Sequence, residues 1–215
     1  MKAGAPPELA VPLLSPTSRL VETTPVALRR SNDGGPPRLP TAVRAGLRGA
    51  VLCVRFDGRD DGRVATLRGR DAPLWQEDVF EVFLAPPVSA GVYYEFEVNP
   101  LGALFDARVE SPEGRRESMR VDVGWNCAGF SARVRTRPGL WSALLRIPLA
   151  PLGAEASAGW RANFYRVDRG TTDEYSAWSP TLADPPDFHR PDRFGFLHFD
   201  GAAEEARVSS PSTGE

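Results

Sequence analysis

The stretches WQEDVFEVFL (residues 75–84) and YYEFEVNP (residues 93–100) decide the fold of this chain. In each of them large apolar side chains alternate with polar ones, which is the period of a β-strand that buries one face. A short connection containing Pro and Gly separates the two stretches, so we expect them to pair as an antiparallel hairpin. The alternation then places Glu81, Glu95 and Glu97 together on the face opposite the apolar one.

Short strands separated by turns continue over most of the remaining sequence. No stretch carries a long 3.6-residue period, although residues 149–156 could form one helical turn. The sequence therefore predicts an all-β fold, an antiparallel β-sandwich, with an up-and-down barrel as the alternative. The strands are expected at about residues 19–29, 41–45, 50–57, 78–84, 92–98, 103–109, 119–123, 130–136, 139–147, 159–167 and 194–199.

The composition of the 215 residues is that of one globular domain, with 41% hydrophobic and 25% charged residues. The formal net charge of -2 predicts that neither nucleic acid nor a membrane surface is a partner. We expect one sandwich domain over residues 15–200, between flexible tails at residues 1–14 and 201–215. Residues 1–16 lack the continuous apolar core of a signal peptide, so a cytoplasmic location is the default expectation.

Cysteine and histidine form no metal-binding pattern in this sequence. Cys53 and Cys127 lack metal-type spacing, and free thiols are favoured over a disulfide between them. With only two histidines, a catalytic zinc site is not expected. The acidic loops at residues 57–61 and 168–173 could hold a calcium ion through oxygen ligands. They do not have the EF-hand spacing, and turn formation is the preferred interpretation.

The polar face of the hairpin is open to more than one interpretation. Carboxylates on neighbouring strands can accept hydrogen bonds from sugar hydroxyls, and Trp75 supplies a flat apolar surface for a sugar ring. The alternative is a solvated outer face whose charge is offset by arginines such as Arg133, Arg135 or Arg146. The carboxylates of Glu81 and Glu97 would also suit a glycoside hydrolase if they lay about 5–10 Å apart.

A family resemblance rests on the motifs PLWQEDVFEVF (residues 73–83), YEFEVNP (94–100), AWSP (177–180) and FHRPDRFG (188–195). With them, the stretch from about residue 41 to residue 200 resembles the family 9 carbohydrate-binding modules. The resemblance implies a jelly-roll-like β-sandwich that binds sugar without catalysis and contains structural calcium. It also implies an association with xylan-degrading enzymes and polysaccharide catabolism, in modules that are usually secreted.

The resemblance implies roles for individual residues as well. The two rings that clamp a terminal sugar in the family fall on Trp75 and Phe188, and its hydrogen-bonding glutamate falls on Glu81. The amide-bearing strand of the family falls near residues 163–165. The chain departs from the family at Glu97, where members carry a basic residue, and Phe188 is a smaller ring than the family's tryptophan.

We therefore predict a non-catalytic carbohydrate-binding protein whose ligand is a fragment or a terminus of a plant-type or microbial polysaccharide. One alternative is a haem-binding electron-transfer module, with axial ligands among Met119, His189 and His198. The other is a glycoside hydrolase that uses Glu81 and Glu97. The predicted ligand-binding residues are Trp75, Glu81, Glu97, Asn99, Tyr165, Arg166, Phe188 and His189.

Overall fold

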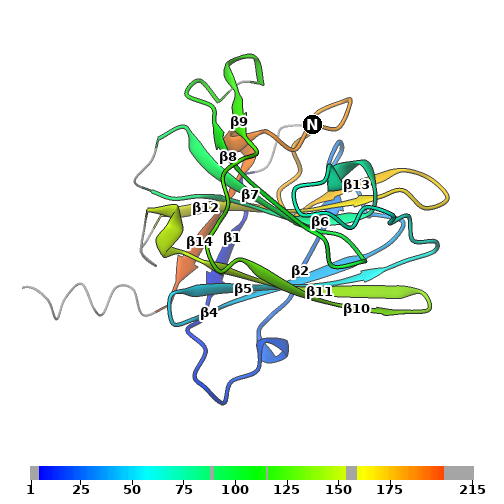
Figure 1. Cartoon of the computed structure of the whole chain (residues 1–215), viewed down its shortest axis with the longest axis horizontal. Coiled ribbons are helices and arrows are strands. Elements are labelled where there is room, and N and C mark those ends of the chain that lie inside the picture. Colours follow the sequence, from blue (N-terminus) through cyan, green and yellow to red (C-terminus); the bar gives the residue numbers. More distant parts are fainter. Residues whose placement is uncertain (1–4, 88–89, 115, 154–158, 201–215) are drawn as a thin grey trace, which may run out of the picture.

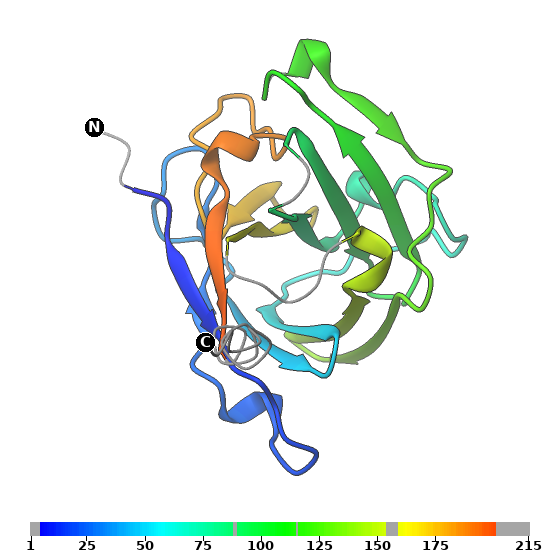
Figure 2. The same cartoon turned by 90° about the vertical axis from the view of Figure 1, so that its left-hand side faces the viewer.

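The structure is a computed structural model that describes residues 5–87, 90–114, 116–153 and 159–200. Its strands form two β-sheets stacked face to face (Figure 1). Neighbouring strands are antiparallel except for β1 and β14, which are parallel. The view turned by 90° shows the strands of the two layers curving around a common interior (Figure 2). The predicted all-β sandwich is therefore confirmed.

The larger sheet carries the surface that matters for function. Its strands follow the order β1 (Glu8–Val11), β14 (Gly195–Phe199), β12 (Trp160–Asp168), β6 (Val79–Ala85), β7 (Val92–Val98), β8 (Leu104–Glu110) and β9 (Arg120–Asp122), with β13 (Glu174–Ala177) beside β12 and β3 (Arg29–Arg30) beside β13.

The smaller sheet closes the other side of the core. Its strands follow the order β10 (Ser131–Arg137), β11 (Leu140–Pro148), β5 (Val51–Arg59), β4 (Thr41–Arg48) and β2 (Val26–Ala27). Short 3₁₀ turns are the helical elements among the described residues: η1 (Leu20–Glu22), η2 (Leu74–Gln76), η3 (Arg116–Ser118), η4 (Ala150–Leu152) and η5 (Pro191–Arg193).

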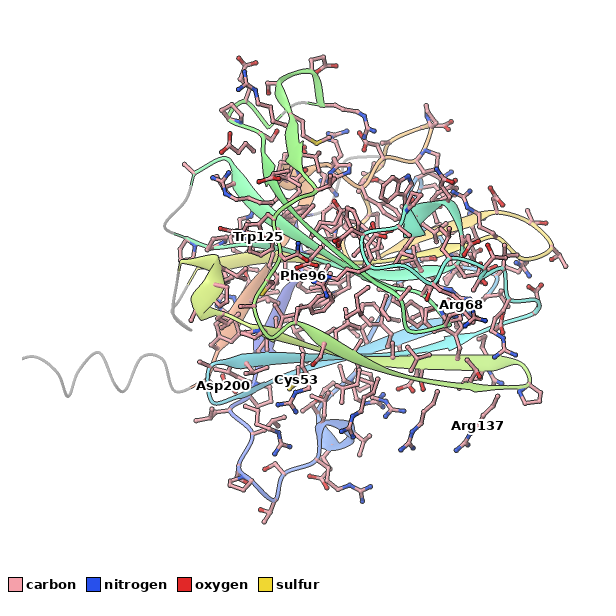
Figure 3. All side chains as sticks on the ribbon, in the orientation of Figure 1. Cys53, Arg68, Phe96, Trp125, Arg137 and Asp200 are labelled. Atoms are coloured by element: carbon pink, nitrogen blue, oxygen red, sulfur yellow. The ribbon has the colours of Figure 1, made fainter. Side chains whose placement is uncertain are left out.

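The hairpin predicted from the alternating pattern is present as β6 and β7. Its register pairs Phe80 with Val98 and Glu81 with Glu97, so the carboxylates share one face as expected. The opposite face points into the space between the sheets, where Phe96 is seen in Figure 3. There Phe80 stacks between Phe56 and Trp141, with ring centroids 4.7 and 3.7 Å away, and joins the two sheets.

The larger sheet is unusual because it buries its outer face too. A second apolar cluster, which includes Val79, Phe83, Phe105 and Tyr165, lies on that side under the loops that follow the strands. Polar groups that the sequence pattern places on an outer face are consequently buried.

The structure revises several sequence-based boundaries. Residues 8–11, within the predicted N-terminal tail, form β1 beside β14, and Val11 is fully buried, so the sandwich begins before residue 15. The expected strand at 19–29 is divided into η1, β2 and the first residue of β3, while β1 and β13 have no counterpart in the prediction. The predicted tail at residues 201–215 lies outside the described residues.

Both cysteines are buried free thiols, as predicted. The expected helical turn near residue 150 is η4. Among the described residues, no helix is long and apolar enough to span a membrane.

Candidate functional site

The candidate site is built on one row of side chains across the outer face of the larger sheet. Strand register aligns Tyr165 of β12, Glu81 of β6, Glu97 of β7 and Phe105 of β8 as successive neighbours. Residues that face one another across paired strands have their Cβ atoms about 5 Å apart, so this row places two adjacent carboxyl groups between two aromatic rings at contact distance. Glu95, two residues from Glu97, lies on the same face.

Loops on this side of the sheet surround an open cavity of about 400 Å³ above the row. Much of its lining is apolar, and Phe83 and Val167 of the sheet contribute to it. Its members with a carboxyl, guanidinium or imidazole group are Glu81, Glu95, Arg116, Arg169, Asp187 and His189. Such a mixture of apolar walls with a few converging polar groups is typical of a small-molecule site.

Trp75 provides an exposed ring at this cavity. It lies in η2, and 43% of its surface is exposed, while its ring and that of Phe105 pack edge to face with centroids 5.3 Å apart. The loop is fixed because Glu77 accepts backbone N–H bonds from Thr66 and Leu67, at 2.7 and 3.1 Å. Arg169 also donates to the carbonyl of Trp75 at 3.1 Å. The indole is thus held at the cavity by its backbone and leaves much of its ring uncovered.

Phe188 provides the second ring, and the strand beneath it fixes its position. Its ring stacks on Tyr165 with a centroid distance of 4.1 Å and an interplanar angle of 12°. The Tyr165 hydroxyl donates to the Phe188 carbonyl at 2.9 Å and accepts from the Asn163 amide at 2.8 Å. Tyr165 therefore holds Phe188 through both its ring and its hydroxyl.

The acidic groups of the site are buried, which the sequence pattern did not indicate. Oxygens of Glu81, Glu95 and Glu97 all lie within 4.8 Å of one another. Burial and then the neighbouring Glu95 charge raise the pKa of Glu81 well above its usual range, although Arg169 opposes this. Burial, followed by the charges of Glu81 and Glu95, raises the pKa of Glu97 in the same way. We name these residues the glutamate triad.

The structure brings four of the predicted ligand-binding residues to the same cavity, namely Trp75, Glu81, Phe188 and His189. The His189 Nδ1 atom lies 2.8 Å from the Tyr93 hydroxyl, which fixes the imidazole at the wall. Glu97 and Tyr165 do not line the cavity, but they adjoin Glu81 in the row below it.

Asn99 and Arg166 lie elsewhere and have structural partners. The Asn99 amide donates to the Leu67 carbonyl at 2.7 Å and accepts from the Leu101 and Ala103 amides, so it closes the β7–β8 turn. Arg166 donates to the Thr41 hydroxyl at 2.9 Å and pairs with Asp168, away from the cavity.

Sequence reasoning did not select Phe105, Arg116, Arg169 or Asp187 as site residues, although all of them line the cavity. The alternation of β8 could have identified Phe105, because it faces Glu97. Arg116 lies in η3, and Arg169 and Asp187 lie in loops. The approach of these segments to the sheet has no local signal in the sequence.

The alternative interpretation of the acidic face as a solvated surface is wrong, because the triad is buried. The arginines proposed to offset it, Arg133, Arg135 and Arg146, lie on β10 and β11 of the other sheet. Of the residues considered as haem ligands, Met119 and His189 line the cavity, whereas His198 lies 3.1 Å from Glu8 at the β1–β14 edge.

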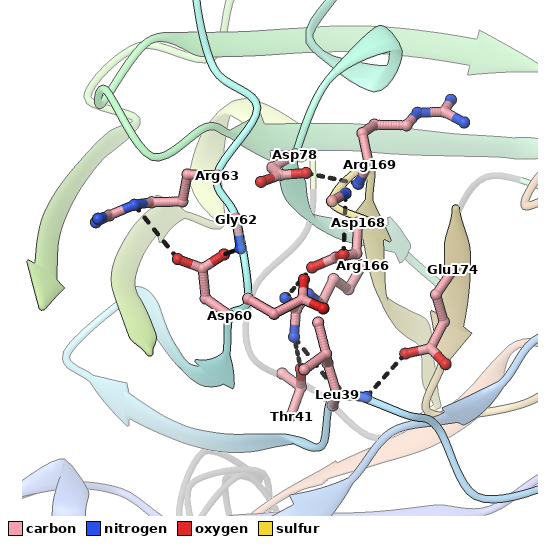
Figure 4. A network of polar contacts seen from close by, with 12 residues as sticks. Leu39, Thr41, Asp60, Gly62, Arg63, Asp78, Arg166, Asp168, Arg169 and Glu174 are labelled. Atoms are coloured by element: carbon pink, nitrogen blue, oxygen red, sulfur yellow. Dashed lines mark hydrogen bonds and ion pairs between the residues drawn. The ribbon is translucent and has the colours of Figure 1, made fainter. Parts of the chain in front are cut away.

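A separate group of carboxylates could hold a cation. Asp60, Asp78 and Asp168 are buried, point toward one another and have oxygens within 4.8 Å of one another (Figure 4). Burial is the main cause that raises the pKa of Asp78 to about 6. Another oxygen lies beside Asp168. A Cβ atom placed on Gly170 would be 3.1 Å from Asp168 Oδ1 and 3.3 Å from the Gly62 carbonyl oxygen, so these two oxygens lie near the same point.

Calcium fits this donor set. The ion binds carboxylate and carbonyl oxygens at about 2.4 Å, so two oxygens that share it lie at most about 4.8 Å apart. Asp60 and Asp168 come from the two acidic stretches that the sequence identified, at residues 57–61 and 168–173. Asp78, the residue before β6, is the third member of the group.

Comparison with solved structures finds the same fold in other proteins. A candidate carbohydrate-binding protein from Bacteroides uniformis is similar with a TM-score of 0.75 and 18% identity, covering 91% of this chain and 100% of that one. A family 9 carbohydrate-binding module from Caldicellulosiruptor kristjanssonii in complex with cellotriose gives a TM-score of 0.64 at 12% identity, covering 90% and 94%. Its complex with glucose gives 0.61 at 12% identity, covering 90% and 96%.

No curated protein matches the chain. The family model described as carbohydrate-binding family 9 matches residues 42–199, a range that runs from the second residue of β4 to the last residue of β14 and includes both rings and all three triad carboxylates. The chain therefore belongs to carbohydrate-binding family 9.

Proposed function

We propose that this protein binds carbohydrate without catalysis, in the cavity between Trp75 and Phe188. The observation that carries the proposal is that the cavity combines an exposed indole and a fixed phenyl ring with carboxylates on its floor. Sugar rings present C–H groups that pack on aromatic faces, and their hydroxyls donate to carboxylates. Fragments or termini of plant-type or microbial polysaccharides are the ligands that we propose.

Isothermal titration with glucose and cellotriose tests this proposal, because related modules were solved with these sugars. Trp75→Ala should weaken binding at least about tenfold, since aromatic groups that anchor a ligand contribute about 2 kcal/mol or more. Leu101→Ala is the matched control, because Leu101 is an exposed apolar residue in the β7–β8 turn outside the cavity. Unchanged affinity in folded Trp75→Ala would show that the sugar binds elsewhere.

We propose further that the protein does not cleave its ligand. The triad oxygens lie within 4.8 Å of one another, whereas an inverting hydrolase separates its two carboxyl groups by about 6.5–9.5 Å to admit water. A retaining mechanism uses about 5–5.5 Å but requires one carboxylate to be an ionised nucleophile. The pKa values of both Glu81 and Glu97 are instead raised. Reducing-sugar release that is lost in Glu81→Gln would contradict this part of the proposal.

We also propose that Asp60, Asp78 and Asp168 hold a structural calcium ion, which would link buried carboxylates from three segments of the chain. Calcium should raise the melting temperature of chelator-treated protein, and Asp78→Asn should reduce that increase. Glu110→Gln is the control, because Glu110 is an exposed carboxylate that pairs with Arg108. A melting temperature that is the same with calcium and with chelator would refute the assignment.

A further inference from the structure

The glutamate triad is the strongest unexplained feature of the cavity. Cross-strand pairing of Glu81 with Glu97, and the position of Glu95 two residues along β7, direct three carboxyl groups to one place. Each has at least one oxygen within 4.8 Å of the others. Like charges at this distance repel strongly in a buried setting, so the arrangement is unfavourable unless protons or a cation compensate it.

Glu97 is the member that points to a missing ligand. Its side chain is fully buried, and apart from the neighbouring carboxyl groups neither of its oxygens has a hydrogen-bond partner among the described residues. A buried polar group without a donor is destabilising by about 1–3 kcal/mol, and more when it is charged. Among the described residues, only the neighbouring carboxyl groups are therefore available to satisfy this buried side chain.

The cations near the triad are engaged with other groups. Arg116 pairs with Asp187 at 2.7 Å, and Arg169 pairs with Asp173 and donates to the Tyr175 hydroxyl. Within the described part of the chain, no ion pair involves a triad carboxylate. The floor of the cavity therefore has three carboxyl groups that no cation of the described residues neutralises.

We propose that the triad makes this cavity selective for a sugar that carries a positively charged amino group. This proposal rests on the proposed sugar-binding function and specifies its ligand class. Glu81 and Glu95 line the cavity directly, and Glu97 lies beside Glu81 beneath it. An ammonium group has three N–H donors on one compact charge, which matches three convergent carboxyl groups.

The surroundings favour an ammonium group over a bare metal ion. Calcium requires six to eight oxygen ligands, whereas the walls above the triad include the rings of Phe83, Phe105 and Phe188. Aromatic faces stabilise an organic cation, so the same walls suit an amino sugar. The ring of that sugar would pack between Trp75 and Phe188, with its amino group directed to the floor.

Titration calorimetry of the full chain at pH 6.5 tests this inference with cellotriose, the glucosamine trimer and its N-acetylated form. The glucosamine trimer should bind at least about tenfold more tightly than cellotriose, because hydrogen bonds to charged groups are the stronger ones. N-acetylation removes the charge and should abolish the preference. Glu97→Gln should reduce the preference toward unity, while Glu8→Gln, at an exposed carboxylate on β1, should retain it.

The outcomes separate this inference from the function on which it rests. Equal or weaker binding of the glucosamine trimer, with cellotriose bound, would overturn the amino-sugar preference and leave the sugar site intact. If folded protein binds none of the three probes, both proposals fail. Titration with Ca²⁺ or Mn²⁺ alone gives the third outcome: stoichiometric binding that Glu97→Gln abolishes would make the triad a metal site and overturn the preference.

Discussion

Replacing Glu97 by Gln should change how the stability of the protein depends on pH, even without a ligand. The substitution keeps the shape of the side chain, removes one ionisable group from the triad and brings an amide that can donate to Glu81 and Glu95. Burial and the two neighbouring charges raise the pKa of Glu97, so the folded protein keeps a proton that the unfolded chain has lost. Stability is then highest at low pH, and it falls as pH rises above about 4.3, where an unfolded glutamate titrates.

The magnitude follows from proton linkage. Each proton that only the folded state retains decreases the free energy of unfolding by about 1.4 kcal/mol per pH unit. As pH rises above about 4.3 the wild type should therefore lose more stability than Glu97→Gln, by up to about 1.4 kcal/mol per pH unit. The loss ends above the raised pKa values of the triad, where the folded state releases its protons as well.

Urea unfolding followed by tryptophan fluorescence at pH 5, 6 and 7 measures these slopes. Glu8→Gln should follow the wild type, because Glu8 is exposed at the sheet edge. Parallel pH profiles for the wild type and Glu97→Gln would refute the conclusion that the buried triad retains protons. A steeper loss in the variant would have the wrong sign and would refute it as well.

Further substitutions separate structural from ligand-binding roles. Tyr165→Phe removes the hydroxyl that holds Phe188, so it should decrease stability by about 1–3 kcal/mol and weaken cellotriose binding although Tyr165 does not line the cavity. Chemical denaturation and calorimetry would measure both effects, and wild-type values for either would contradict the support role. Asn99→Ala should decrease the free energy of unfolding by about 2 kcal/mol, because three backbone groups lose their hydrogen-bond partner. The folded variant should still bind cellotriose normally, and loss of binding would show that Asn99 contacts the ligand. Arg166→Met leaves Asp168 without its buried partner and should decrease the free energy of unfolding by about 3–5 kcal/mol in chemical denaturation. A change below about 1 kcal/mol would show that this pair is not important for stability.

The strands were predictable because their signal is local. Alternation with a period of two is enforced by strand geometry, and it located the β6–β7 hairpin and the shared face of Glu81 and Glu97. The prediction that the hairpin has one apolar face and one polar face was also correct. The sequence did not predict that the polar face would be buried. That burial depends on loops such as the one that carries Phe188, which follows β12 by many residues and returns over it.

The candidate site shows the same division between local and long-range information. Trp75 and Glu81 were identified because they flank or belong to a clear strand, and both line the cavity. Asn99 has the same period as the acidic residues, but its amide closes a turn, and nothing in the alternation distinguishes these roles. Arg166 was also predicted to contact ligand, yet its side chain points to the opposite face from Tyr165.

The sequence by itself determined the all-β class, the pairing of the central hairpin and the presence of an acidic face with a tryptophan beside it. These features depend on the side-chain period and the turn residues within short stretches, and both are visible in the sequence itself. Only the tertiary structure decided that three carboxyl groups meet under aromatic walls, and that Asp60, Asp78 and Asp168 meet elsewhere. Those arrangements arise when strands and loops far apart in the sequence pack together, and burial then changes a solvated acid into a group that requires a proton or a cation.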